Sequence, residues 1–162
     1  MPDTVGTHRP ARLQAVAASP AQRVLVVANE TATSPTLIAE LRDRAARGPV
    51  SFHLVVPALN TRLRHWLSDT DDAVSDARRR GQDAAVVLGS HGLPVSVEIG
   101  DSVPLLAIED ALSGFDAQEI VISTRAPERS HWLEHDLVDR ARGRFGVPVR
   151  RVIATDEVLV AA

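Results

Sequence analysis

Short runs of branched apolar residues recur along the chain, separated by longer stretches with apolar residues at helical spacing. Arg23–Ala28 and Phe52–Pro57 are such runs, and a nearly continuous apolar run is typical of a strand buried on both faces of a sheet. Further strands are predicted over Val95–Ile99, Glu119–Ser123 and Val147–Ala154, the first of them alternating like an edge strand. The pattern therefore predicts a sheet of five strands.

The first interval between strands carries the signals of a helix. Ser34 and Pro35 provide an N-cap and a first helical residue, and Gly48 with the proline after it ends the helix. The apolar residues at helical spacing between these signals are Leu37, Ile38, Leu41 and Ala45. We therefore expect a crossover helix with this apolar face.

A second amphipathic helix is predicted from Asp71 to the neighbourhood of Gly89. Its apolar face consists of Ala73, Val74, Ala77, Gly81, Ala84, Ala85 and Leu88. The basic run Arg78–Arg80 could contact phosphate or an acidic partner, but we interpret it as a solvated helix face. Gly89 and Gly92 are interpreted as helix-ending glycines, because a strand follows directly after Pro94.

Two more helices are predicted, one with Pro104 in its first turn that ends at Gly114, and one from Ser130 to Arg144. Strand and helix thus alternate strictly, which favours parallel strands joined by right-handed crossovers, with helices on both faces of an open sheet. We expect one α/β domain of this kind over residues 23–162. A flexible tail is expected over residues 1–22, where polar residues interrupt every apolar run.

Composition narrows the classes of function. The chain has no cysteine, which excludes disulfides, thiolate metal sites and thiol chemistry. A net charge of −3 and 3% aromatic residues disfavour nucleic-acid binding, since neither a basic surface nor stacking platforms are abundant. No apolar run is long enough to span a membrane, so we expect no membrane partner and a cytoplasmic location.

In an open doubly wound sheet, ligands bind beyond the carboxyl ends of the strands, where the strand order reverses. If the first and fourth strands are neighbours, the loops over residues 29–33 and 124–129 meet there. The candidate binding residues in and beside these loops are Asn29, Thr31, Ser123, Thr124, Arg125, Arg129 and Ser130. Hydroxyls, arginines and the free N–H groups of the following helix suit an anion such as phosphate. A structural alternative stays open, in which Ser130 caps the helix, the arginines are solvated and Asn29 turns the chain.

The residues between Arg23 and Ile153 resemble the universal stress protein family. The similar features are Val24–Ala28, Gly100-Asp101 followed by Ala107-Ile108-Glu109, Glu119–Ile122 and Val147–Val149. The resemblance implies a Rossmann-like fold, an open five-stranded parallel sheet with strand order 3-2-1-4-5, and often a dimer formed through the last strand. It also implies a non-catalytic module of the stress response.

Two departures from the family concern ATP binding. Asn29 stands where the family usually has an aspartate that contacts adenine, and asparagine cannot supply the carboxylate. ATP-binding members also carry a G-x-x-G-(nine residues)-G-[ST] loop after the fourth strand, whereas this chain has no glycine between Gly114 and Gly143. Arg129 and Trp132 occupy that region, so close approach of the backbone to phosphates is not expected. We therefore expect no cofactor, with ATP as the alternative.

Signals for catalysis are weak. The segment His131–His135 matches the H-x-x-E-H zinc pattern, and its two histidines would share one helical face. A zinc site needs a further ligand and a substrate cleft, and we interpret the segment as a surface helix face. No G-x-S-x-G elbow occurs, and the sequence nominates no catalytic triad. The chain is therefore expected to hold no metal and not to be an enzyme.

The end of the chain has features of a partner surface. Val147–Ile153 is the edge strand of the implied order, and an unpaired edge pairs readily with another chain. Val158–Ala162 adds an apolar tail, which we expect to be buried in a homodimer or against its own sheet. The leading hypothesis is a stress-response module that acts through dimerisation and an unknown protein partner, without ATP. The alternative is a sensor of a nucleotide (ATP or AMP) or another anion where strands one and four meet.

Overall fold

The computed structural model describes residues 20–59, 70–126 and 132–155 of the chain. The described strands form one parallel sheet in the order β3-β2-β1-β4-β5, which confirms the predicted α/β architecture. The strands are β1 (Gln22–Val27), β2 (Val50–Pro57), β3 (Val95–Gly100), β4 (Glu119–Arg125) and β5 (Val149–Ala154). The helices are α1 (Pro35–Arg47), α2 (Thr70–Ser90), α3 (Pro104–Gly114) and α4 (Trp132–Arg144).

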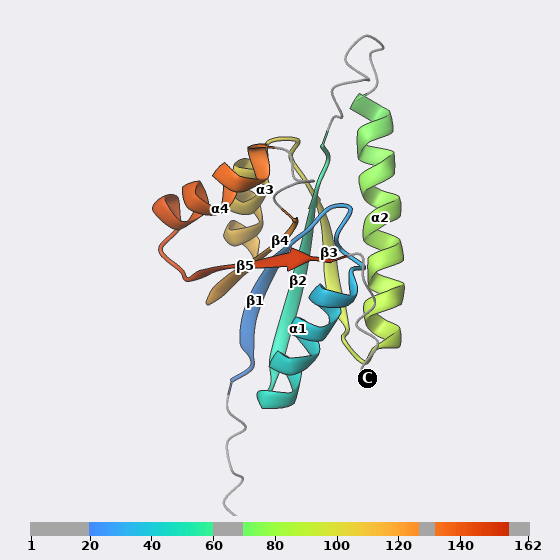
Figure 1. Ribbon diagram of the computed structural model, residues 1–162, viewed down its shortest axis with the longest axis vertical. Coiled ribbons are helices and arrows are strands. Elements are labelled where there is room, and N and C mark those ends of the chain that lie inside the picture. The colour runs from blue at the N-terminus through green and yellow to red at the C-terminus, as the bar shows by residue number, and fades with distance from the viewer. Residues whose placement is uncertain (1–19, 60–69, 127–131, 156–162) are drawn as a thin grey trace, which may run out of the picture.

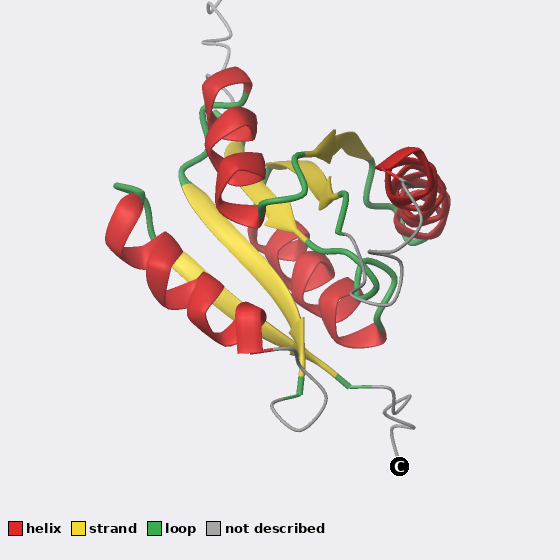
Figure 2. Ribbon diagram, turned by 90° about the horizontal axis from the view of Figure 1, so that it is seen from above, coloured by secondary structure: helices red, strands yellow, loops and turns green. Residues whose placement is uncertain are grey.

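Helices cover both faces of the sheet (Figures 1 and 2). Because successive side chains of a strand point to opposite faces, each central strand contributes side chains to two cores, one on each face of the sheet. Val26 and Leu54 belong to the core beneath α1 and α2, whereas Leu25 and Val55 belong to the core beneath α3 and α4. Burial on both faces explains why the central strands are continuous apolar runs in the sequence.

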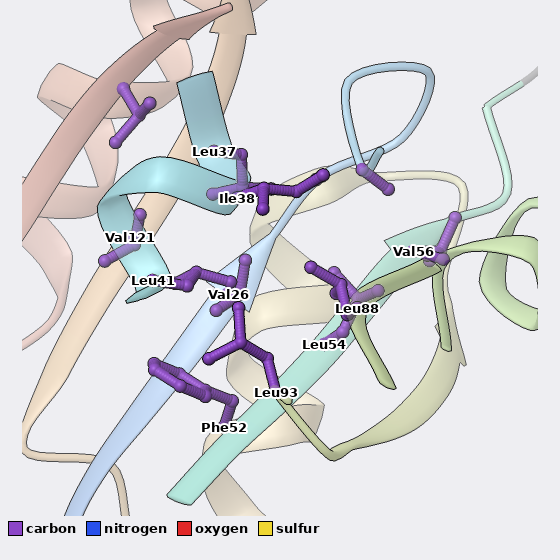
Figure 3. Close-up of a cluster of buried hydrophobic side chains, with 14 of the residues drawn as sticks. Val26, Leu37, Ile38, Leu41, Phe52, Leu54, Val56, Leu88, Leu93 and Val121 are labelled. Atoms are coloured by element: carbon purple, nitrogen blue, oxygen red, sulfur yellow. The ribbon is translucent and has the colours of Figure 1, made fainter. Parts of the chain in front are cut away.

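The core beneath α1 and α2 is built from aliphatic side chains of both helices and of the central strands. Figure 3 shows Leu37 and Leu41 of α1 near Val26 of β1, and Leu88 of α2 near Leu54 of β2. All five of these side chains are fully buried. Full burial of one such side chain stabilises a fold by about 1.5–3 kcal/mol, so this face holds the sheet and the two helices together.

Helix α1 begins as predicted. Ser34 is the N-cap, its Oγ accepts a hydrogen bond from the Leu37 backbone N–H at 3.2 Å, and Pro35 is the first helical residue. The prediction for Ala45 was wrong, because this residue is exposed. The neighbouring Arg44 is turned toward the sheet instead, where it pairs with Glu119 of β4.

Helix α2 packs closely on the sheet at a glycine. Its buried residues are Ala77, Gly81, Ala84 and Leu88, all from the predicted apolar face. A Cβ atom on Gly81 would lie 2.8 Å from Cγ1 of Val97 on β3, so only glycine fits without a shift. Val74 was wrongly placed on the buried face, since it remains 37% exposed.

The end of α2 confirms one of the two predicted helix-ending glycines. Gly92 has a φ of 74°, and the N–H of Leu93 donates to the Leu88 carbonyl at 2.9 Å. The N–H of Gly92 donates to the Gly89 carbonyl at 3.0 Å, which completes the Schellman arrangement. Gly89 itself lies inside the last turn of α2, so its predicted role as a stop was wrong.

In the described parts of the chain, no helix is both long and apolar enough to cross a membrane. The predicted N-terminal tail up to residue 19 and the apolar segment Val158–Ala162 lie outside the described residues.

Candidate functional site

The carboxyl ends of β1 and β4 lie side by side, as the position of the candidate site requires. The two strands pair in parallel with Val27 opposite Ile122, so the loop after β1 begins beside the last residues of β4. Thr31 in that loop donates its hydroxyl to the backbone carbonyl of Ser123 at 3.1 Å. The loop is therefore fixed against β4 at the point where the strand order reverses.

Both ends of the Asn29 side-chain amide already have protein partners. Its side-chain amide donates to the Pro57 carbonyl at the end of β2 at 2.6 Å. Its side-chain oxygen accepts a hydrogen bond from the Arg80 guanidinium of α2, also at 2.6 Å. Both ends of the amide are thus used to tie the loop after β1 to β2 and α2.

Glu30 lies between two arginines from different elements. Its carboxylate forms an ion pair with Arg125 at the end of β4, and a second one with Arg80 of α2 at 3.5 Å. The three side chains are between 34% and 47% exposed, so solvent and ions reach them. We name Glu30, Arg80 and Arg125 the carboxylate clamp. It places the negative charge of Glu30 against the cations that an anionic ligand would use.

Ser123 has a buried side-chain oxygen without a hydrogen-bond partner in the described part of the chain. The residue as a whole is 7% exposed. Ser123 and Arg125 are two residues apart on β4, so both point to the same face of the sheet. A buried hydroxyl without a partner is costly, which makes this atom a potential ligand contact.

Thr124 points to the opposite face of β4. Its hydroxyl accepts a hydrogen bond from Nε of Arg151 on β5 at 2.9 Å, and the residue is 1% exposed. The structure therefore brings Asn29, Thr31, Ser123 and Arg125 together but engages Thr124 elsewhere. Arg129 and Ser130, the remaining predicted site residues, lie outside the described residues.

Sequence reasoning missed Glu30 and Arg80. The prediction that Arg78–Arg80 is a solvated helix face holds for Arg78 and Arg79, but it was wrong for Arg80. Arg80 precedes Gly81, the residue at which α2 touches the sheet, and this border position allows it to reach the strand ends. Glu30 was visible beside Asn29, but its pairing with two arginines depends on three elements that are distant in sequence.

Metal binding has no support among the residues described. No group of three or more His, Asp or Glu side chains there could hold a metal ion. His131 of the H-x-x-E-H pattern lies outside the described residues. The described part of the fold therefore offers no cluster of ligands that supports the zinc alternative.

The strand order, which reverses direction between β1 and β4, defines a doubly wound α/β fold. Neither a protein-family model nor a curated protein matches the sequence. Solved structures do match, and those described below are universal stress proteins. That of Archaeoglobus fulgidus is 17% identical with a TM-score of 0.56, and the match covers 82% of this chain and 98% of that one.

Two further solved structures contain nucleotides. The universal stress protein of Archaeoglobus fulgidus in complex with dAMP is 16% identical, with a TM-score of 0.54 and coverage of 82% and 97%. A universal stress protein family protein of Arabidopsis thaliana with AMP bound is 12% identical, with a TM-score of 0.53 and coverage of 83% and 93%. The chain therefore has the universal-stress-protein fold, as the sequence resemblance implied.

Proposed function

We propose that this protein is a non-catalytic, universal-stress-protein-like module that acts in the cytoplasm through dimerisation and partner binding, without ATP. The observation that supports this function most directly is the carboxylate clamp. Glu30 holds Arg80 and Arg125, and Arg80 also binds Asn29. The polar groups at the β1/β4 junction are thus bonded mainly to one another.

A nucleotide at this junction would meet two obstacles. Its phosphates would face the carboxylate of Glu30, and an adenine near Asn29 would compete with the Pro57 carbonyl and Arg80 for the side-chain amide. Each exposed ion pair contributes only about 0–1 kcal/mol, so the clamp can open. What continues to weaken phosphate binding after the ion pairs open is the negative charge of Glu30, which remains beside any bound phosphate.

Dimerisation through β5 is supported by the sheet topology. β5 is an edge strand that pairs with β4 on one side only in the described sheet. Ile153 on this strand is 40% exposed, so an apolar side chain is accessible to a partner at this edge. A second copy added along this edge would cover Ile153 and satisfy the unpaired backbone groups.

One experiment on purified protein tests this function. Sedimentation is expected to give a homodimer, and mass spectrometry of the denatured sample is expected to release no stoichiometric nucleotide. Ile153→Asp is expected to shift the protein to the monomer, while Val86→Asp, on the exposed face of α2, leaves the dimer intact. A monomer at all concentrations, or one adenine nucleotide per chain, would overturn the proposed function.

A second candidate, an anion-binding sensor, is favoured by one specific observation. The unpartnered Oγ of Ser123 and the guanidinium of Arg125 lie on one face at the end of β4. An anion that displaced Glu30 would find a hydroxyl donor and two arginines there. Nucleotide released from the purified protein, and lost from a Ser123→Ala variant, would select this candidate.

A further inference from the structure

A serine, a histidine and a glutamate meet on the sheet face that carries α3, away from the β1/β4 junction. His53 of β2 and Ser96 of β3 are direct partners in the parallel register, and Glu98 follows two residues later on the same face. Nδ1 of His53 lies 2.6 Å from Oγ of Ser96, and Nε2 lies 2.9 Å from Oε2 of Glu98. One imidazole thus joins a hydroxyl to a carboxylate.

The partners of His53 determine where its ring proton lies. The ionised carboxylate of Glu98 can only accept a hydrogen bond, so Nε2 of the neutral ring carries the proton and donates it. Nδ1 is then left with its lone pair and accepts a hydrogen bond from the Ser96 hydroxyl. The neutral ring that matches both contacts is therefore the tautomer in which Nδ1 can act as a base toward Ser96.

The surroundings hold the imidazole still while leaving the serine accessible. The ring of His53 stacks on that of Phe115 with centroids 5.1 Å apart and an interplanar angle of 28°. The His53 side chain is only 14% exposed, whereas Ser96 is exposed to solvent. The base is thus fixed and partly shielded, and its hydroxyl partner is exposed to solvent on an edge strand.

Two other exposed serines, Ser90 and Ser113, differ from Ser96. The hydroxyls of Ser90 and Ser113 donate to backbone carbonyls of their own helices, at 2.6 Å and 3.1 Å. Ser96 also approaches the Phe52 carbonyl, but at 3.5 Å, which is far longer than its contact with His53. A carbonyl cannot take up the hydroxyl proton during a reaction, whereas a neutral imidazole can.

We propose that Ser96 is an activated nucleophile that accepts an acyl group from an activated acyl ester. Oγ attacks the ester carbonyl carbon while its proton passes to Nδ1 of His53. The tetrahedral adduct then expels the alcohol oxygen, which takes that proton, so the products are O-acyl-Ser96 and the free alcohol. Glu98 acts as a positioning residue that stabilises the transient imidazolium. This covalent modification site is independent of the β1/β4 junction.

The test uses p-nitrophenyl acetate as the acyl donor and the full chain as the protein. The sequence has no lysine, cysteine or tyrosine, so competing acylation is limited to the N-terminus, histidines and ordinary hydroxyls. Peptide mass spectrometry over time is expected to show acetylation of Ser96 at least tenfold faster than that of Ser113. His53→Gln is expected to slow acetylation of Ser96 by about 100-fold, the lower end of the range for general-base assistance.

Two further variants separate a chemical role from a structural one. Glu98→Gln keeps the shape of the side chain and is expected to slow acetylation of Ser96 by about tenfold. Ser113→Ala serves as the matched control and should leave the rate at Ser96 unchanged. Thermal melting and circular dichroism identify any misfolded variant, and Glu98→Gln provides the decision if His53→Gln fails to fold. Equal rates at Ser96 and Ser113 in the unaltered protein would overturn the inference.

Discussion

Arg44 and Arg47 are three residues apart on α1, but their guanidinium groups have different surroundings. The Arg44 side chain is 10% exposed and pairs with Glu119 of β4, which is 16% exposed, and with Glu40 one turn earlier. Hydrogen bonding to Glu119 raises the pKa of Arg44 above its ordinary value. The Arg47 side chain is 75% exposed and pairs with Asp43 on its own helix. The first pair joins α1 to the sheet, whereas the second is a surface pair.

Replacing these two arginines should separate the two kinds of ion pair. Arg44→Gln is expected to lower the free energy of unfolding by about 2 kcal/mol, because Glu119 loses its positively charged partner in a nearly buried position. Arg47→Gln is expected to lower it by less than about 0.5 kcal/mol. Urea unfolding of the two variants measures the difference, and equal losses would contradict this account of the α1 contact.

The pH dependence of the Arg44 effect follows from the direction of its pKa shift. The pKa of Arg44 is higher in the folded than in the unfolded state, so its charge stabilises the fold. This stabilisation is fully present below the unfolded pKa and is lost only as the pH rises through the folded pKa. For an arginine this loss falls in strongly alkaline solution. The destabilisation by Arg44→Gln should therefore be constant between roughly pH 6 and pH 9.

At the scale of elements, α2 is held against β3 by a residue without a side chain. Gly81 faces Val97 and Ile99, and a Cβ atom there would lie 2.8 Å from the first and 3.3 Å from the second. Gly89, two turns later on the same helix, has no atom within 4 Å of such a Cβ. The two glycines therefore differ in their packing while sharing one helix.

This difference predicts opposite effects of substitution in α2. Gly81→Val is expected to lower the free energy of unfolding by about 1–3 kcal/mol, since the added atoms force α2 away from β3. Gly89→Ala is expected to raise it by about 0.5–1 kcal/mol, since alanine favours the helix and meets no neighbour. Chemical denaturation of both variants measures these changes in the free energy of unfolding. Stabilisation by Gly81→Val would show that α2 does not pack on β3 as described.

How far the sequence predicted the fold depends on the range of the interaction concerned. The strands were predictable because burial on both faces leaves a local apolar run, and α1 because Ser34 and Pro35 are local start signals. The contact of His53 with Ser96 and Glu98 could not be predicted from the sequence, because it depends on the register between β2 and β3. Residues that face each other across strands leave no local pattern in the sequence.

For the molecule as a whole, we propose that the carboxylate clamp determines which ligands the β1/β4 junction can accept. The loop after β1, the middle of α2 and the end of β4 are joined by Glu30, Arg80 and Arg125. Proteins with this fold include structures that contain dAMP and AMP. Loss of nucleotide binding here would follow from a resident carboxylate on an otherwise shared architecture, which leaves dimerisation and partner binding as the proposed activity.

The most direct test of the clamp is calorimetric titration of AMP into the unaltered protein and a Glu30→Gln variant, side by side. Removing the resident charge is expected to tighten AMP binding by about tenfold, equivalent to about 1.4 kcal/mol, from an affinity weaker than about 1 mM. Glu109→Gln, which also removes the partner of one arginine but lies on α3, should leave the affinity unchanged. Equal affinity of the unaltered protein and the Glu30→Gln variant, including no binding in either, would contradict the account.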